Sequence, residues 1–242
     1  MRAEPVDTSG LEVVQLHGLR VPIDRRLMSE TIIWSLTSGR YEMGEARALP
    51  HLVRPGERVV EVGAGIGVLT ALIARTGKAE QVVAIEANPM LQDYIQGLHR
   101  LNGVDVELRQ ALVTPGRGAP TADFYLHQDL WASSPERIKR RHQIGVVQAP
   151  VISLSEIAET WRPSLLVVDV EPFAAWTHAE APPHALACAD FRPFERLLLE
   201  LKSRKFAPEA VKRVFDHLSA QGFAYDLEGS NGPLVLFRRL GA

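Results

Sequence analysis

The strongest constraint on the fold of this chain is a stretch of ten residues, Arg58 to Gly67, with the sequence RVVEVGAGIG. A β-branched apolar run ends in three glycines spaced two apart, and an apolar helical pattern begins at Val68. This order predicts a buried strand, a tight turn and a buried helix. Glycine suits such a turn because it tolerates positive φ and lets a ligand approach the backbone closely. The same pattern also occurs in purely structural turns, so a second feature is needed to indicate a binding site.

Two acids supply that feature. Glu61 lies in the first run, and Glu86 ends a second β-branched run, Gln81 to Glu86, nineteen residues after Gly67. In dinucleotide folds an acid about 20 residues after the glycine turn binds ribose hydroxyls. A nicotinamide fingerprint needs a third glycine where this chain has Val68. The observed pattern, E-x-G-x-G-x-G, instead resembles motif I of the class I S-adenosylmethionine (SAM)-dependent methyltransferases.

That resemblance implies SAM as the cofactor. It implies that the first acid serves the methionine end of SAM and that the second serves the ribose. The cofactor-binding residues assigned on this basis are Glu61, Gly63, Gly65, Gly67 and Glu86.

The rest of the chain alternates strand-like and helix-like patterns. The last two expected strands, Phe223 to Leu227 and Leu234 to Arg238, are joined by only about six residues, Glu228 to Pro233. A parallel crossover needs a dozen or more residues, so this pair must be antiparallel. The expected fold is α/β: a Rossmann-like class I methyltransferase sheet, mostly parallel with an antiparallel last strand, and with helices on both faces.

The expected organisation is a single domain with additions. Residues 1–50 are interpreted as an N-terminal cap that does not fold independently, and residues 51–242 as a SAM-binding methyltransferase domain. An inserted flap is expected at about 115–153. Its basic run, Arg137, Lys139, Arg140 and Arg141, could contact an acidic or phosphorylated substrate, although such runs are more often solvated surface.

Several shorter stretches are similar to the FkbM family of methyltransferases. They are Gly39-Arg40-Tyr41-Glu42 with Glu45, Pro55-Gly56, Glu86-Ala-Asn88-Pro89, Phe124-Tyr125, Trp131 with Ser133-Ser134, Ile152-Ser-Leu154 and Val168-Asp169-Val170-Glu171. The resemblance implies O-methylation of a hydroxyl on a sugar, polyketide or related small molecule. It also implies that Tyr41 and Glu45 close over SAM and that adenine lies near Gln110, Ala111 and Leu112. Pro172 stands where the family has glycine, which puts the acceptor class in doubt.

Asp169 and Glu171 are the candidate catalytic residues. They stand near the end of an apolar run, where open α/β sheets bind ligands. An acid there can act as a general base toward an acceptor hydroxyl. The alternative is a structural network of acids.

Composition narrows the expected partners. The chain has 27 Lys and Arg against 29 Asp and Glu, a net charge of −2, which favours neither nucleic acid nor an anionic membrane. The partner that the FkbM resemblance implies is a small-molecule hydroxyl acceptor. A single cysteine, Cys188, fits a reducing, cytoplasmic compartment. No metal site is expected, because His178, His184 and Cys188 lack a familiar ligand spacing.

Two alternative functions stay open. One is a SAM-binding module without transferase activity. The other is an N-methyltransferase acting on a protein or RNA, against which stand the balanced charge and the absence of an Asn/Asp-Pro-Pro-aromatic signature.

Overall fold

The computed structural model describes residues 10–129, 133–136, 143–170, 189–201 and 208–241. Their centre is a seven-stranded sheet in the order β11-β12-β10-β9-β3-β4-β5. The strands are β3 (Arg58–Val62), β4 (Gln81–Glu86), β5 (Glu107–Gln110), β9 (Leu165–Val168), β10 (Arg196–Glu200), β11 (Phe223–Asn231) and β12 (Leu234–Arg239).

The direction of the strands follows the expected plan. Strands β10, β9, β3, β4 and β5 are parallel to one another, whereas β12 runs antiparallel to both β10 and β11. This confirms a mostly parallel, Rossmann-like sheet with an antiparallel last strand.

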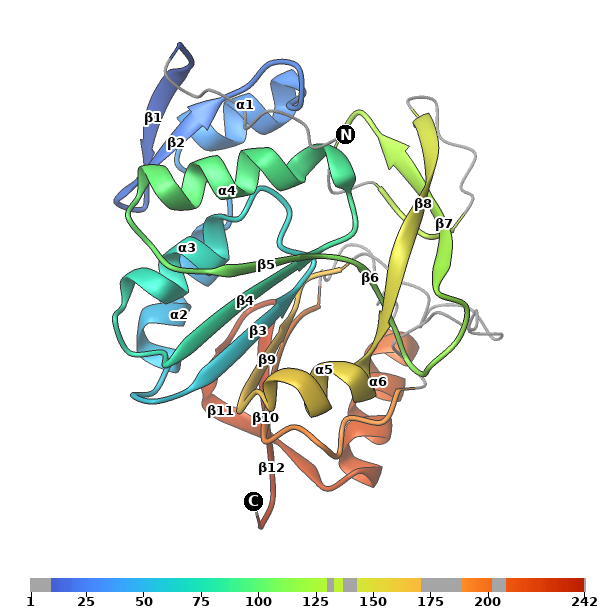
Figure 1. The fold of residues 1–242 in the computed structure, drawn as a ribbon. Coiled ribbons are helices and arrows are strands. Elements are labelled where there is room, and N and C mark those ends of the chain that lie inside the picture. Colours follow the sequence, from blue (N-terminus) through green and yellow to red (C-terminus); the bar gives the residue numbers. More distant parts are fainter. Residues whose placement is uncertain (1–9, 130–132, 137–142, 171–188, 202–207, 242) are drawn as a thin grey trace.

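Helices cover both faces of the sheet (Figure 1). On one face lie α2 (Met43–Leu52), α3 (Val68–Arg75) and α4 (Gln92–Leu101), the last preceded by the short helix η1 (Pro89–Leu91); on the other lie α5 (Leu154–Trp161) and α6 (Pro208–Ala220). Successive strand residues point to opposite faces, so Val59 joins the core under α3 while Val60 joins the core under α5 and α6. Both faces of β3 are therefore buried, which explains its unbroken apolar sequence.

The N-terminal segment adds a small layer on one side. An antiparallel hairpin forms from β1 (Glu12–Leu16) and β2 (Leu19–Ile23), and α1 (Glu30–Thr37) follows it. The Tyr94 hydroxyl of α4 donates to the carbonyl of Pro22 at 2.6 Å and so fastens the hairpin to α4. The domain division at residue 50 stays a prediction.

The stretch Val104 to Val113, whose sequence pattern alone indicates one strand, forms two strands in the structure. It divides at Ala111 into β5, which stays in the main sheet, and β6 (Leu112–Thr114), which leaves it. Strand β6 pairs with β8 (Gln143–Ser153), and β8 pairs antiparallel with β7 (Thr121–His127). Apolar periodicity identifies a strand but not its partner, so it could not indicate this division. The second, three-stranded sheet lies in the region of the expected flap, whose boundaries stay a prediction.

None of the described helices is long and apolar enough to cross a membrane.

Candidate cofactor site

The candidate site lies at the carboxyl ends of β3, β4 and β9, which adjoin because these strands are parallel neighbours. The turn after β3 is held against the end of β4: the N–H groups of Gly63 and Ala64 donate to the carbonyl of Ile85 at 2.9 and 3.1 Å. The ends of these three strands thus bring together Glu61, the three glycines, Glu86 and Asp169.

The three glycines of the turn all have positive φ but meet different surroundings. A Cβ on Gly63 would lie 2.3 Å from the carbonyl oxygen of Asp169, and one on Gly67 would lie 2.8 Å from Ile95. A Cβ on Gly65 would meet only the Tyr41 hydroxyl, at 3.5 Å. Gly63 and Gly67 therefore allow close packing within the protein, while a Cβ at Gly65 would make only one ordinary contact, which leaves more room on that side.

Glu86 is clamped by the backbone around it. Its two carboxylate oxygens accept the N–H groups of Gly65 at 2.8 Å and Asn88 at 2.7 Å. Burial, opposed by these backbone hydrogen bonds, raises the pKa of Glu86 to about 7. Each oxygen keeps a second lone pair, so the fixed carboxylate can still accept hydroxyl donors from a ligand.

Glu61 is buried more completely than Glu86, with 1% of its surface exposed. Among the described residues, its Oε2 atom has no hydrogen-bond partner. Burial and the nearby charges of Asp169 and Glu86 raise the pKa of Glu61 well above its usual value. A buried acceptor without a partner is costly and therefore rare in folded proteins. Here it indicates that a ligand supplies the missing donor.

Other predicted residues gather around these acids. Tyr41 lies two residues before α2 and Glu45 lies in its first turn; the charge of Glu45 contributes to the raised pKa of Glu61. Asp169 is partly exposed, and its N–H donates to the carbonyl of Val62 at 3.0 Å, which continues the β3–β9 pairing. Ala111 lies beside Glu86, to whose carbonyl its N–H donates at 3.2 Å.

Glu42 belongs to this group but was given no role by the sequence reasoning. It precedes α2 with a left-handed backbone (φ 49°), and its Oε2 is buried without a hydrogen-bond partner in the described part of the chain. Burial, then the charges of Glu61 and Asp169, raise the pKa of Glu42 well above its usual value. One signal was present: Glu42 and Glu45 are three residues apart at a helix start, a spacing that places side chains near each other.

A buried histidine, His99, contacts the end of the glycine turn from α4. Nε2 of His99, on α4, lies 3.1 Å from the Thr70 hydroxyl and 3.2 Å from the carbonyl of Gly67. Burial lowers the pKa of His99 to about 4, so the ring is neutral near pH 7. Its role in this geometry is to join α4 to the start of α3.

Other residues considered in the sequence analysis lie outside the described part of the chain or away from this site. Glu171, the basic run of residues 137–141, His178, His184 and Cys188 lie outside the described residues. His127, which the sequence alone suggests as a surface histidine, is instead buried in the second sheet, where its Nδ1 accepts the N–H of Asp129 at 3.0 Å.

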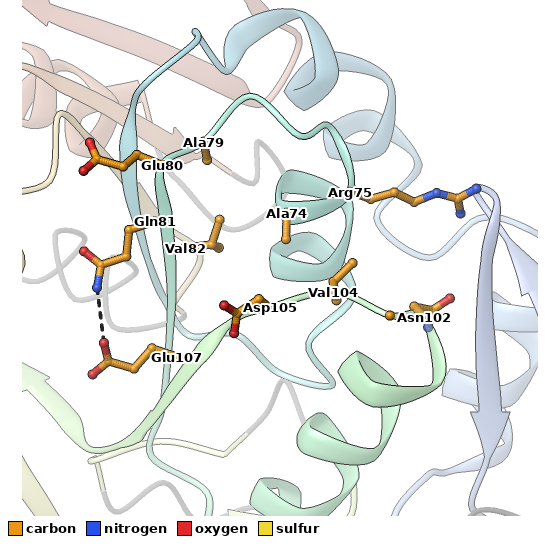
Figure 2. A pocket seen from close by; sticks show the side chains of 11 residues that line it. Ala74, Arg75, Ala79, Glu80, Gln81, Val82, Asn102, Val104, Asp105 and Glu107 are labelled. Carbon is orange, nitrogen blue, oxygen red and sulfur yellow. Dashed lines mark hydrogen bonds between the residues drawn. The ribbon is translucent and has the colours of Figure 1, made fainter.

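A groove of about 590 Å³ lies at the amino ends of β4 and β5, opposite the candidate site (Figure 2). Gln81 and Glu107, the first residues of β4 and β5, line it and hydrogen-bond to each other at 3.3 Å. Because Glu86 and Gln110 end the same strands, this groove and the acid cluster are separated by the length of the sheet. The groove is therefore no part of the candidate site.

Comparison with known proteins gives a family match for part of the chain. A model of the TRM5/TYW2 methyltransferase domain matches residues 13–114. The ribosomal protein L11 methyltransferase of Symbiobacterium thermophilum is 42% identical over 65 residues, which are 27% of this chain and 21% of that protein. The matched part is thus about a fifth of that curated relative.

Solved structures with a similar fold include three from archaea. Trm5b from Pyrococcus abyssi has a TM-score of 0.49 and 15% identity, over 94% of this chain and 55% of that one. A P. abyssi tRNA (uracil-54, C5)-methyltransferase has a TM-score of 0.49 and 13% identity, over 94% of this chain and 43% of that one. TYW2 from M. jannaschii has a TM-score of 0.45 and 13% identity, over 95% and 87%. At these identities the likeness concerns the fold alone.

Two expectations need correction. The resemblance to the FkbM family is wrong, because the family model that matches is the TRM5/TYW2 methyltransferase domain. The exclusion of nucleic acid as a partner is contradicted as well, by the match of residues 13–114 to the TRM5/TYW2 methyltransferase domain. Net charge is an average over the whole surface, so it could not exclude a local contact with RNA.

The comparisons agree with the expected enzyme class and cofactor, a methyltransferase that uses SAM, but give no support to O-methylation of a small molecule. The segment that carries the glycine turn, Glu61 and Glu86, residues 13–114, is similar to the TRM5/TYW2 methyltransferase domain.

Proposed function

We propose that this protein is a SAM-dependent methyltransferase that transfers a methyl group to a base nitrogen of RNA. The observation that carries the proposal is the pairing of the open turn at Gly65 with two buried carboxylates, Glu61 and Glu86, inside the segment that matches a methyltransferase domain. In the described part of the chain the charges that act on the pKa values of these acids are those of other acids, which fits a cationic ligand that also carries hydroxyls.

The residues present fit the parts of SAM. Glu86, fixed by two backbone N–H groups, would accept the ribose hydroxyls. Glu61 would face the methionine end, where its partnerless oxygen meets a positive charge. Ala111, which directly follows β5, would lie beside the adenine. When bound, SAM supplies a methyl group on a positively charged sulfur and leaves as neutral S-adenosylhomocysteine (SAH).

The remaining task of the chain is to hold the acceptor in line and to take its proton. Alignment of reacting groups alone can supply a large part of a rate enhancement. Asp169 lies beside the glycine turn and is partly exposed, so we assign it as the proton acceptor for the attacking nitrogen. Glu171 remains a second candidate from the sequence, outside the described residues.

The choice of RNA rests on the family match, with support from the sequence. Between the described ends of β7 and β8 the chain carries Arg137, Lys139, Arg140 and Arg141. Such a run suits contacts with phosphates, which position RNA without reading its sequence. A protein side-chain nitrogen is the second candidate acceptor, favoured by the 42% identity to an L11 methyltransferase over 65 residues.

The test is methyl transfer from tritiated SAM to three acceptors: bulk tRNA, total ribosomal protein and buffer alone. We expect label in tRNA that ribonuclease releases. Label that enters ribosomal protein instead would identify the second candidate. Binding of SAM without label in either acceptor would favour the non-catalytic SAM-binding module.

Two variants sharpen the assay. Asp169→Asn should lower the transfer rate by about 10²–10⁴-fold, the usual contribution of a general base, with little effect on SAM affinity. Replacing Lys139, Arg140 and Arg141 together by Ala should weaken RNA binding and leave SAM binding unchanged. A rate within about threefold of wild type for Asp169→Asn would rule out that residue as the base.

A further inference from the structure

We propose that Glu42 is the second carboxylate of a pocket that it forms with Glu61 to bind the ammonium group of the methionine end of SAM. The inference rests on the proposed function and extends it to one group of the cofactor and to one residue outside the motif.

The first observation is a pair of buried acceptors. The Oε2 atoms of Glu42 and Glu61 are both buried, and neither has a hydrogen-bond partner among the described residues. Glu61 has 1% of its surface exposed. The charge of Glu61 raises the pKa of Glu42, so the two acids lie near each other. Two buried acceptors without partners would be a double defect in a protein without a ligand. A ligand group that donates hydrogen bonds to both Oε2 atoms would remove this defect.

The second observation is the sign of the surrounding charge. The charged groups that act on the pKa of Glu42 are Glu61, Asp169 and Glu45, and all of them raise it. The tyrosine hydroxyl of Tyr41 is the one group that opposes them, through a hydrogen bond. A positive ligand group is therefore the missing partner.

The choice of an ammonium follows from the acceptors. An ammonium has three N–H donors that can point to separate carboxylate oxygens, whereas a sulfonium has none. Among the described residues, no group of three or more His, Cys, Asp and Glu side chains is arranged to hold a metal ion. Two partnerless oxygens therefore fit the ammonium better than the sulfonium or a metal.

The cap segment holds Glu42 at this place. Nε2 of His17, in the turn of the β1–β2 hairpin, lies 2.6 Å from the carbonyl of Tyr41. The Tyr41 hydroxyl reaches the open side of Gly65. Glu42 follows directly, in a left-handed conformation that non-glycine residues seldom adopt. The N-terminal segment thus brings an acid to the glycine turn.

The test is a cycle of one variant and three ligands, with affinities measured by calorimetry. The ligands are SAH, its deaminated analogue with hydrogen in place of the ammonium, and methylthioadenosine, which lacks the whole amino-acid part. We expect Glu42→Gln to weaken SAH about 10- to 100-fold and to leave methylthioadenosine within about twofold. Glu30→Gln, an exposed acid of the same cap segment paired with Arg25, is the matched control and should change nothing.

The wild-type protein gives an independent result if Glu42→Gln does not fold. It should bind the deaminated analogue about 10- to 100-fold more weakly than SAH. Equal affinity for the two ligands would overturn the ammonium pocket, and so would equal weakening of SAH and methylthioadenosine by Glu42→Gln. A wild-type protein that binds none of the three ligands would instead refute the proposed function.

Discussion

At the residue scale, Gly63 and Gly65 illustrate how one residue type serves two purposes within three positions. Gly63 lies so close to the backbone of Asp169 that a methyl group has no room, and nothing there can move cheaply. A Cβ at Gly65 would meet only the Tyr41 hydroxyl, at an ordinary contact distance of 3.5 Å. The two positions should therefore respond differently to substitution.

Gly63→Ala should destabilise the fold, because a Cβ at 2.3 Å from a backbone oxygen forces β3 and β9 apart. Gly65→Asn should keep the fold, since Asn tolerates the left-handed region at φ 55°, and should abolish SAM binding by filling the room beside the turn. Urea unfolding and calorimetry with SAM check the two effects separately. If Gly65→Asn bound SAM normally, the turn would be only structural.

Some of these residues could be predicted from the sequence and others could not. The spacing from the turn to Glu86 is local to one strand–helix–strand unit, so it could be predicted. The position of Glu42 depends on how the cap packs against the turn and on a left-handed residue before α2. No periodic pattern encodes that arrangement.

At the element scale, a buried ion pair joins the other ends of the strands. Nη1 of Arg196, the first residue of β10, lies 2.5 Å from Oε1 of Glu57, with 5% and 7% of the side chains exposed. Arg196 also donates to the carbonyl of Leu52 at 3.0 Å, and Glu57 accepts the N–H of Arg54 at 2.7 Å. The pair thus connects the end of α2, the start of β3 and the start of β10.

Arg196→Leu should destabilise the protein by about 3–5 kcal/mol, because Glu57 is left as a buried, unpaired charge. Urea unfolding monitored by circular dichroism measures the change. Arg192→Leu is the control: its pair with Asp190 is exposed and should leave the unfolding midpoint unchanged. Equal effects of the two substitutions would show that burial does not decide the strength of these pairs.

Elements also differ in how well their arrangement could be predicted. The antiparallel pairing of β11 and β12 followed from the short connection alone. The pairing of β6 with β8 could not be predicted in this way. Strand β8 begins about thirty residues after β6, and no local pattern distinguishes β8 from β4 as the partner.

At the scale of the whole molecule, the acids of the site connect cofactor binding to pH. In the free protein the pKa of Glu86 is about 7, and the pKa values of Glu61 and Glu42 are well above the usual value. Because the folded chain retains these protons longer than the unfolded chain, the stability of the free protein falls as pH rises from about 4.5 through 7. A bound cation and hydroxyl donors favour the ionised acids, so binding releases protons.

The stabilisation of the protein by SAH should therefore grow with pH. With pKa near 7, Glu86 alone changes its ionised fraction about tenfold between pH 6 and 8, and the affinity should change similarly. At 100 times Kd the ligand adds about 2.7 kcal/mol, a rise in Tm of a few degrees. Thermal unfolding with SAH at pH 6 and pH 8 measures this. In Glu86→Gln the difference between the two pH values should shrink; an unchanged difference would assign the proton release to other groups.

The strand order of the main sheet also has a consequence for how the chain folds. Strand β3 lies between β4 and β9, yet β9 follows β4 by about eighty residues. The segment that matches the family model ends at residue 114, so alone it would leave one edge of β3 open and the apolar face under α5 uncovered. Native structure at the cofactor site therefore depends on contacts between distant parts of the chain. We expect slow folding, and a nascent chain that acquires SAM affinity only after β9 has emerged from the ribosome.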